Sequence, residues 1–262
     1  MKNIESIVNV IEDSLVDYLR IAAKNGNRPF VLNNKIGWIR TFPTAWSNFI
    51  FYANFDYNEI DKQIAQLCFD MENGEIPNEW VVGPKSIPSD LGYYLEKNNI
   101  IKQFSMAGMA IDIKKMDITL TIPDNLYIEI VDTKSKMLVW TDVVSRGLWN
   151  GETFESCLFE NLISNPDYKF YIAYLNGEAV ASSMLMLSNN VAGIEMVSTI
   201  QQYQGMGIGT AMTVTPLLYA KDSGYNIGVL QASEAGEPVY RKIGFEEYCR
   251  FDVYKYQIHM KH

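Results

Sequence analysis

The stretch QGMGIGT, residues 204–210, follows a largely apolar run over residues 191–200. Its three glycines, Gly205, Gly207 and Gly209, allow the backbone to turn sharply and leave no Cβ atom in the way of a bound group. Apolar residues recur at helical spacing after this stretch, so we predict a strand, a glycine loop and the start of a helix. Such a helix start offers unpaired N–H groups and a positive dipole end, which bind anions such as a diphosphate.

Two common nucleotide-binding motifs do not fit this loop. A dinucleotide-binding fold uses G-x-G-x-x-G in its first strand–helix–strand unit, whereas the spacing here is G-x-G-x-G and lies late in the chain. A P-loop ends in Gly-Lys followed by Ser or Thr, but Thr210 follows Gly209 directly. A purely structural turn stays open as an alternative when the loop is considered alone.

A second motif follows about thirty residues later. Residues 226–231 are typical of a strand, and residues 236–243 are typical of a short helix that ends at Gly244. Tyr240 lies in that helix, four residues before Gly-Phe. In this order and spacing, the two motifs resemble those of the GNAT (GCN5-related) N-acetyltransferase superfamily. The resemblance covers residues 124–258.

The resemblance implies the GNAT fold, a mixed and twisted α/β sheet with helices on both faces. It implies an enzyme, an acyltransferase that moves an acetyl group from acetyl-coenzyme A to a primary amine by direct attack in a ternary complex. The alternative is a non-catalytic coenzyme A sensor or interaction module. Backbone N–H groups of the strand and the loop are expected to hold the co-substrate. The expected binding residues are Val197, Ser198, Thr199, Gln204, Gly205, Met206, Gly207, Ile208, Gly209 and Thr210. Most relatives carry arginine where this chain has Gln204, so the loop keeps a donor but loses a charge.

Two side chains are candidates for the chemistry. Tyr240 matches the family's tyrosine acid beside the cofactor sulfur, and a phenol stays protonated at neutral pH. Glu195 is the sole charged residue among residues 191–200. Strand alternation places it on the same face as Val197 and Thr199 unless a bulge intervenes. Three interpretations of Glu195 stay open: a base, a contact to a cationic substrate, or a residue that points to solvent.

A metal centre is not expected. The two histidines, His259 and His262, lie at the extreme carboxyl end, which disfavours a zinc site or a histidine triad. The three cysteines are widely spaced, without a C-x-x-C pair. None of them adjoins either motif, so we do not expect an acyl-enzyme intermediate.

The chain has 262 residues, which favours two domains. Residues 121–125 are typical of a linker, so we predict an amino-terminal domain at 1–122 and a GNAT acetyltransferase domain at 123–262. In the first half, residues 80–83, 88–98 and 106–113 repeat the closing strand–helix–strand pattern of the second. We interpret it as a degenerate GNAT-like copy without a glycine loop, although convergent patterning explains the echo nearly as well. This half is expected to cover the acceptor cleft or to mediate a homodimer.

Local patterns assign most of the second half. A turn at Asn176-Gly177 should join two strands as a hairpin, and Ser223-Gly224 should end the helix after the glycine loop. Pro216 lies within that helix and should kink it. The expected strands are 126–131, 168–174, 179–187, 192–200, 226–231 and 247–258, and the expected helices are 134–148, 153–163, 208–222 and 236–243.

The charge and hydropathy of the chain indicate which classes of binding partner to expect. The formal net charge of −9 disfavours nucleic acid, which requires a basic footprint. The amino terminus alternates apolar and acidic residues, unlike a signal peptide, and no window reaches the ~18 apolar residues of a membrane helix. We therefore expect a cytoplasmic protein without a membrane partner. The acceptor is expected to be a small-molecule or peptide amine.

Overall fold

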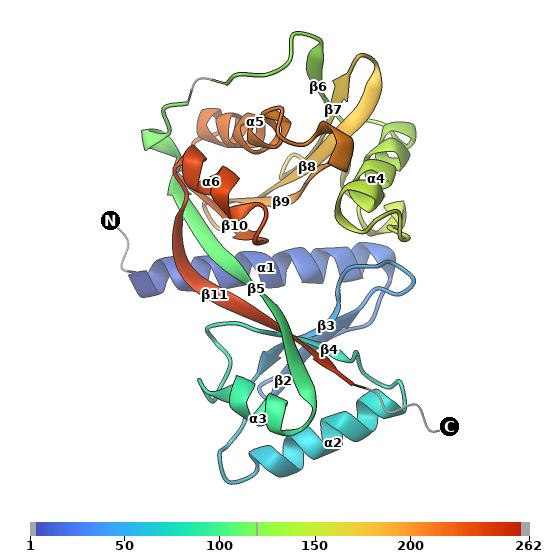
Figure 1. Ribbon diagram of the computed structural model, residues 1–262, viewed down its shortest axis with the longest axis vertical. Helices are drawn as coiled ribbons and strands as arrows, with labels where there is room; N and C mark the ends of the chain where they lie inside the picture. Colours follow the sequence, from blue (N-terminus) through green and yellow to red (C-terminus); the bar gives the residue numbers. More distant parts are fainter. Residues whose placement is uncertain (1–3, 119, 258–262) are drawn as a thin grey trace.

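One sheet passes through both halves of the chain (Figure 1). A computed structural model describes residues 4–118 and 120–257. Within these residues the strand order is β1-β2-β3-β4-β11-β5-β10-β9-β8-β7-β6. The strands are β1 Phe30–Leu32, β2 Ile36–Arg40, β3 Asn48–Ala53, β4 Glu79–Val82, β5 Ile100–Asp112, β6 Leu126–Ile130, β7 Tyr168–Leu175, β8 Glu178–Ser188, β9 Val191–Thr199, β10 Ile227–Ala232 and β11 Glu246–Tyr256. The helices are α1 Ile4–Gly26, α2 Ile60–Glu72, α3 Leu91–Lys97, α4 Lys134–Leu148, α5 Ile208–Asp222 and α6 Glu237–Ile243.

Helices cover both faces of the carboxy-terminal part of the sheet. α1 and α4 share a buried core with one face, and α5 and α6 share a second core with the other. A third core joins α2 and α3 to the amino-terminal strands. The long helix α1 buries Ile11, Leu15, Tyr18 and Ala22, a spacing of three to four residues that makes one apolar face. The expected mixed sheet with helices on both faces is confirmed.

The longest strands, β5 and β11, connect the two halves. β5 ends the amino-terminal half, yet its residues from Ala107 to Asp112 pair with β10 of the carboxy-terminal half. β11 closes the chain and pairs with β4, for example Val253 with Val81. The two strands also pair antiparallel with each other along most of their length. Figure 1 shows this pair descending from the upper to the lower part of the molecule. The boundary at 122/123 stays a prediction, since the sheet is continuous across it.

Most elements predicted for the second half are confirmed. α4 and α5 have the predicted bounds, and α5 is continuous through the buried Pro216. Asn176 and Gly177 have φ of 52° and 84°, as the tight hairpin requires. β11 ends at Tyr256, one residue before the described part of the chain ends, and residue 258 of the predicted strand and both histidines lie outside the described residues.

The helix predicted over 153–163 is wrong. Two 3₁₀ turns, Ser156–Leu158 and Glu160–Leu162, occupy this segment. Phe159 separates them with φ of −137°, and its ring is fully buried. Glu155 is held by an ion pair to Arg28 and by the hydroxyl of Thr44. Contacts with the amino-terminal half therefore override the helical spacing.

The strand–helix–strand pattern predicted in the first half is present, with shifted bounds. α3 begins three residues later than expected, and β5 begins at Ile100 instead of residue 106. Strands β1 to β3 and helix α2 were not predicted. Among the described helices, none combines the length and the apolar character needed to cross a bilayer.

Candidate active site

The candidate site lies where two parallel strands separate. β9 and β10 pair only at Val191, Ala192 and Gly193 of β9, which match residues 227–229 of β10. Beyond this point β10 pairs only with β5, whereas β9 continues to Thr199. The strands therefore diverge and leave a wedge between their carboxyl ends. Ligands of open α/β sheets bind in such crevices.

The glycine loop closes the wide end of this wedge. Gly205 and Gly207 have φ of 79° and 80°, a region that non-glycine residues rarely adopt. A Cβ atom on Gly207 would lie 2.5 Å from the carbonyl oxygen of Thr121, so no side chain fits there. Gly209 has ordinary geometry, and a Cβ atom there would lie 3.6 Å from Thr199 Oγ1. Two of the three glycines are thus required by the backbone.

The loop leads directly into the amino terminus of α5. Gly207 is the N-cap and has no side chain to occupy the first N–H groups of the helix. The N–H groups of the first turn have no partner within a helix, so they stay available to an anion. A Cβ atom on Gly205 would meet nothing within 4 Å, which shows open space beside the loop. These features fit a diphosphate.

Gln204 takes a structural position. Its Nε2 atom donates to the carbonyl oxygen of Thr199 at 3.0 Å. The side-chain amide of Gln204, which replaces the family's arginine, therefore fixes the loop to the end of β9. Anion binding would rest on backbone N–H groups and not on this side chain.

A cavity of about 540 Å³ brings most of the predicted binding residues together. Its walls include Val197, Ser198, Thr199 and the glycine loop on one side, and Tyr240 on the other. Three predicted site residues do not line it: Met206 is 43% exposed, and the side chains of Ile208 and Glu195 are buried. The remaining lining residues were not among the predicted binding residues; they are Gly147, Leu148, Tyr203, Ser233, Ala235, Gly236, Val239 and Lys242.

Two of these additional residues come from α4 and its end. A Cβ atom on Gly147 would lie 2.7 Å from Ser198 Oγ, so α4 packs directly on β9 at the cavity. No local signal in the sequence indicates this contact. Among the described residues, Lys242 is the only basic one that lines the cavity, and it follows Tyr240 by two residues in α6. The second motif thus contained a signal for Lys242.

A β-bulge interrupts β9 at the cavity. Glu195 pairs with Met184 and Ser198 pairs with Ser182, so Met196 and Val197 together face one residue of β8. Met196 has φ of 51°, and its carbonyl oxygen accepts a hydrogen bond from Ser182 Oγ at 3.0 Å. The bulge leaves backbone groups outside the regular ladder at the point where the strands separate.

The bulge also corrects the expected orientation of Glu195. Met184, its partner in β8, belongs to the core with α1 and α4. Val197 packs against the core on the α5 side, and Thr199 lies near Gly209 of α5. Glu195 therefore faces α1, on the side opposite Val197 and Thr199. Alternation failed here because the bulge adds one residue to the strand.

Glu195 is a buried carboxyl group. Its exposed fraction is 9%, which excludes the interpretation that it points to solvent. Burial raises its pKa from the ordinary value to about 8. Its Oε1 atom has no hydrogen-bond partner within the described part of the chain. An unpaired buried carboxyl of this kind is suited to accept a proton or to contact a cation.

Tyr240 occupies the other side of the wedge. Its exposed fraction is also 9%, and its ring contacts that of Phe245 edge-on with centroids 5.9 Å apart. Burial, followed by the charge of Glu195, raises the pKa of the phenol. Tyr240 therefore stays protonated at neutral pH, and it lies within electrostatic reach of Glu195.

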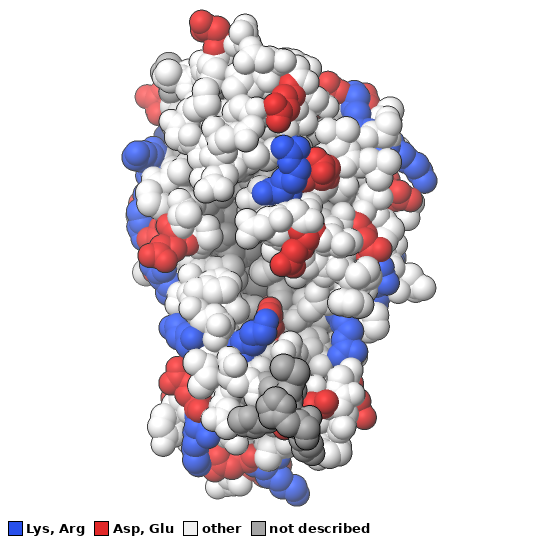
Figure 2. Space-filling view, turned by 45° about the vertical axis from the view of Figure 1, so that its right-hand side comes forward, with Lys and Arg blue, Asp and Glu red and all other residues white. Residues whose placement is uncertain are grey.

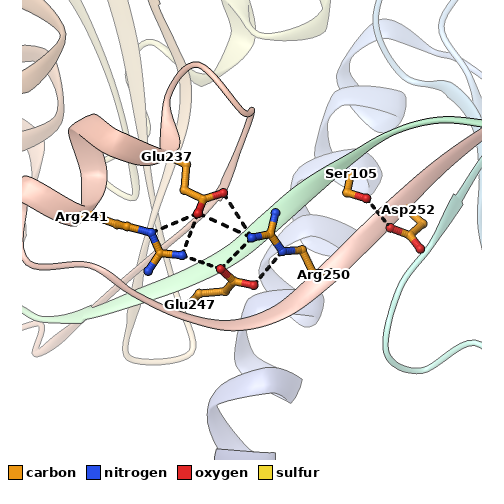
Figure 3. Close-up of polar contacts among 6 residues, drawn as sticks. All are labelled: Ser105, Glu237, Arg241, Glu247, Arg250 and Asp252. Atoms are coloured by element: carbon orange, nitrogen blue, oxygen red, sulfur yellow. Dashed lines mark hydrogen bonds and ion pairs between the residues drawn. The ribbon is translucent and has the colours of Figure 1, made fainter.

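A network of charged side chains fixes the helix that carries Tyr240. Arg241 contacts Glu237 at 2.7 Å and Glu247 at 2.5 Å. Arg250 contacts the same two carboxylates at 3.3 and 2.6 Å. Figure 3 shows these contacts joining α6 to β11 and, further along β11, the bond from Ser105 to Asp252. Because the groups are partly exposed, their net contribution to stability is small.

The corresponding point of the amino-terminal half is closed. There β3 and β4 are the parallel pair, but the chain continues to pair beyond them. The N–H of Ile87 donates to Ala53 and the N–H of Phe55 donates to Ile87, both at 2.9 Å. The turn before α2 carries Asp56 and Glu59 in place of glycines. Backbone pairing and negative charge both disfavour a second diphosphate site.

Comparisons with known proteins agree with this geometry. Residues 166–247 match the family model described as an acetyltransferase (GNAT) domain. The carboxy-terminal half contains a GNAT domain. The match covers the hairpin, β9, the glycine loop, β10 and α6, which are the elements that build the wedge. A search of curated proteins gave no match.

Solved structures show the GNAT fold over most of the chain. A GCN5-related N-acetyltransferase from Kribbella flavida has a TM-score of 0.67 at 14% identity, covering 92% of this chain and 96% of that one. One from Sphaerobacter thermophilus has a TM-score of 0.63 at 12% identity, covering 80% and 73%. A tandem GNAT protein from the clavulanic acid biosynthesis pathway has a TM-score of 0.56 at 12% identity, covering 84% and 77%. The last similarity is consistent with a GNAT-like amino-terminal half.

Proposed function

We propose that this protein transfers an acetyl group from acetyl-coenzyme A to a primary amine by direct attack in a ternary complex. The observation that carries the proposal is the single cavity lined by the glycine loop, the bulged strand and Tyr240. Each of these three parts supplies a different requirement of acyl transfer: binding of the diphosphate, polarisation of the carbonyl, and protonation of the leaving thiolate.

Binding would rest on the start of α5. The N–H groups of residues 207–210 would face the diphosphate, and Lys242 would add positive charge at the rim. The rest of the protein surface would not attract coenzyme A, which is a polyanion. On the face shown in Figure 2, basic and acidic side chains are interspersed, and the net charge of the chain is negative.

The chemistry would proceed in one addition and one elimination. The amine nitrogen attacks the thioester carbonyl carbon while an N–H of the bulge, at Val197, stabilises the oxyanion. Glu195 accepts the proton that the amine loses, directly or through a water molecule. The C–S bond then breaks, and the Tyr240 hydroxyl gives its proton to the thiolate. Proton exchange with solvent restores both side chains.

The acceptor would be a cationic amine on a small molecule or a peptide. Glu195 has no cationic partner among the described residues, so an ammonium group would neutralise the buried carboxylate as it enters. Glu195 accepts one ammonium proton and passes it to solvent, which generates the neutral nucleophile and restores the carboxylate for the proton that is lost in the attack. This role unites the two interpretations of Glu195 that the structure leaves open, base and substrate contact.

Thermal shift with coenzyme A and acetyl-coenzyme A tests the binding step. Binding to the folded state should raise the Tm with a dependence on ligand concentration. A screen of amine acceptors, monitored by thiol release, then tests turnover. No Tm shift at millimolar ligand would reject the proposal. Binding without turnover of any amine would favour a sensor or interaction module instead.

A further inference from the structure

We propose that Tyr18, contributed by the amino-terminal half, is a positioning residue for Glu195. In this inference, which rests on the proposed role of Glu195 in acetyl transfer, the Tyr18 hydroxyl donates a hydrogen bond to the ionised carboxylate during turnover. The amino-terminal half would then take part in catalysis through α1, although its own cleft is closed.

The first observation is the path of α1 across the carboxy-terminal part of the sheet (Figure 1). Gln231 of β10 donates to the carbonyl oxygen of Ile11 at 3.3 Å. The Asp17 carboxylate accepts from Ser188 Oγ at 3.2 Å, at the turn before β9. Ser14 packs on β9 so closely that a Cβ atom on Gly193 would lie 2.7 Å from its Oγ atom. α1 is therefore in direct contact with the bulged strand.

The second observation is the match between helix and strand spacing. Four residues of helix, from Ser14 to Tyr18, advance about 6 Å. Two residues of strand, from Gly193 to Glu195, advance about 6.7 Å and return to the same face. Since Ser14 covers Gly193, Tyr18 lies one turn further along the same face of α1, on the side of the sheet toward which Glu195 points. The charge of Glu195 contributes to a raised pKa of Tyr18, second only to burial, which agrees with this placement.

The third observation is that three segments fix the Tyr18 ring and hydroxyl. The ring is 1% exposed and stacks on Phe159 with centroids 5.8 Å apart. Ser47, from the loop before β3, is buried and lies near enough to the hydroxyl to lower its pKa. When Ser47 donates to the phenol oxygen, the phenol proton is free to bond Glu195, whose Oε1 has no partner.

Two tyrosines lie within electrostatic reach of Glu195. Among the described residues, the titratable groups that its charge affects are Tyr18 on α1 and Tyr240 on α6. No lysine or arginine of the described part of the chain contributes to the pKa of Glu195. Tyr240 is assigned to the leaving thiolate, so Tyr18 is the donor that stabilises the ionised base. A donor of this kind lowers the pKa of a carboxyl group.

The test compares Tyr18→Phe with Tyr171→Phe. Both changes remove one hydroxyl from a buried tyrosine, but Tyr171 faces the α5 core, and its hydroxyl has no partner. The pH profile of kcat/KM and the pH dependence of the unfolding free energy both report the pKa of Glu195. Loss of a hydrogen bond to a charged group should raise that pKa by about one to two units in Tyr18→Phe. Tyr171→Phe should leave it unchanged.

The double variant Tyr18→Phe with Glu195→Gln completes the cycle. In the Glu195→Gln background, Tyr18→Phe should no longer shift either pH profile. If Tyr18→Phe leaves both midpoints within 0.2 units of the wild type (about the precision of such profiles), the inference is overturned and the proposed function stands. If the wild type binds no acetyl-coenzyme A, the proposed function fails, and the unfolding measurements still decide whether Tyr18 acts on Glu195.

Discussion

Glu195 and Tyr240 are electrostatically coupled across the point where β9 and β10 separate. The carboxyl group of Glu195 lies on the α1 side of β9, and the phenol of Tyr240, in α6, lines the cavity. The charge of Glu195 raises the pKa of Tyr240, and burial raises the pKa of both. One side chain thus has a pKa near neutrality and the other stays protonated, the combination that the proposed acyl transfer requires.

Replacement of Glu195 by glutamine should change stability in a pH-dependent way. The pKa of Glu195 is about 8 in the folded state and near its ordinary value of 4.5 when unfolded. Its stabilising contribution is therefore complete below pH 4.5 and is lost as pH rises through 8, by an amount on the order of 5 kcal/mol. Glu195→Gln should flatten this decline, measured by urea unfolding from pH 4 to 9, and lower kcat by roughly 10² to 10⁴.

Glu12 provides a matched control for that measurement. It is a second buried carboxyl group, on α1. Unlike Glu195, it accepts a hydrogen bond from a backbone N–H, that of Lys85 at 3.0 Å, and its charge is not among the causes of the raised pKa of Tyr240. Burial raises its pKa to about 7. Glu12→Gln should likewise flatten the decline in stability, with a midpoint near pH 7, yet keep kcat at the wild-type level. Equal losses of kcat in both variants would contradict the assignment of Glu195.

Replacement of Tyr240 by phenylalanine should lower kcat by roughly 10² to 10⁴ because the leaving thiolate loses its proton donor. The ring contact with Phe245 is retained, so affinity for coenzyme A, measured by calorimetry, should change little. An acceptor with full activity in this variant would show that Tyr240 is not the acid.

The glycines of the loop should differ in their tolerance of alanine. Gly207→Ala combines a positive φ with a contact of 2.5 Å to a backbone carbonyl, so it should destabilise the fold and abolish binding of coenzyme A. Gly209→Ala makes an ordinary contact of 3.6 Å and should fold like the wild type. Thermal unfolding and ligand titration of the pair compare the two. Similar losses in both would mean that the loop backbone differs from the one described.

Lys242 should contribute to affinity through its charge. Lys242→Ala should weaken binding of coenzyme A by roughly two- to tenfold, and the difference should shrink as salt increases. Lys221→Ala is the control, since this lysine lies in the last turn of α5 and does not line the cavity. A salt-independent effect in Lys242→Ala would indicate lost packing instead.

Binding should saturate at one coenzyme A per chain. The amino-terminal wedge is closed by the bonds between Ile87 and residues 53 and 55, so it has no room for a pantetheine arm. Isothermal titration gives the stoichiometry directly. Two equivalents per chain would require this pairing to open.

Local signals predicted much of the second half, because its elements have clear starts, ends and periodicities. The glycine loop before α5 and the Asn176-Gly177 turn are examples, since backbone conformation alone determines these residues. The bulge at Met196 had no such signal, because register depends on β8, and it reversed the expected face of Glu195. The role of Gly147 was equally hidden, since it depends on how α4 packs on β9.

The amino-terminal half was harder to predict for a related reason. Its strand–helix–strand echo was visible, but strand pairing between β5 and β10 is a long-range property. The approach of α1 to β9 likewise depends on small residues, Ser14 and Gly193, that carry no pattern of their own. The parts of the fold that local patterns did not predict are therefore those that depend on contacts between segments far apart in the sequence.

The shared strands β5 and β11 constrain the order in which the chain can fold. β4 pairs with β3 on one side, but it cannot gain its second neighbour until β11 has been synthesised, because Val81 pairs with Val253. During translation the first half therefore exposes strand edges while almost the whole remaining chain is made. Strand pairs between residues so far apart in the sequence form late and slowly. Until they form, the unpaired strand edges can pair with other chains. Pairing of β11 with β4 and β5 would therefore be the folding step in which both halves reach the native state together.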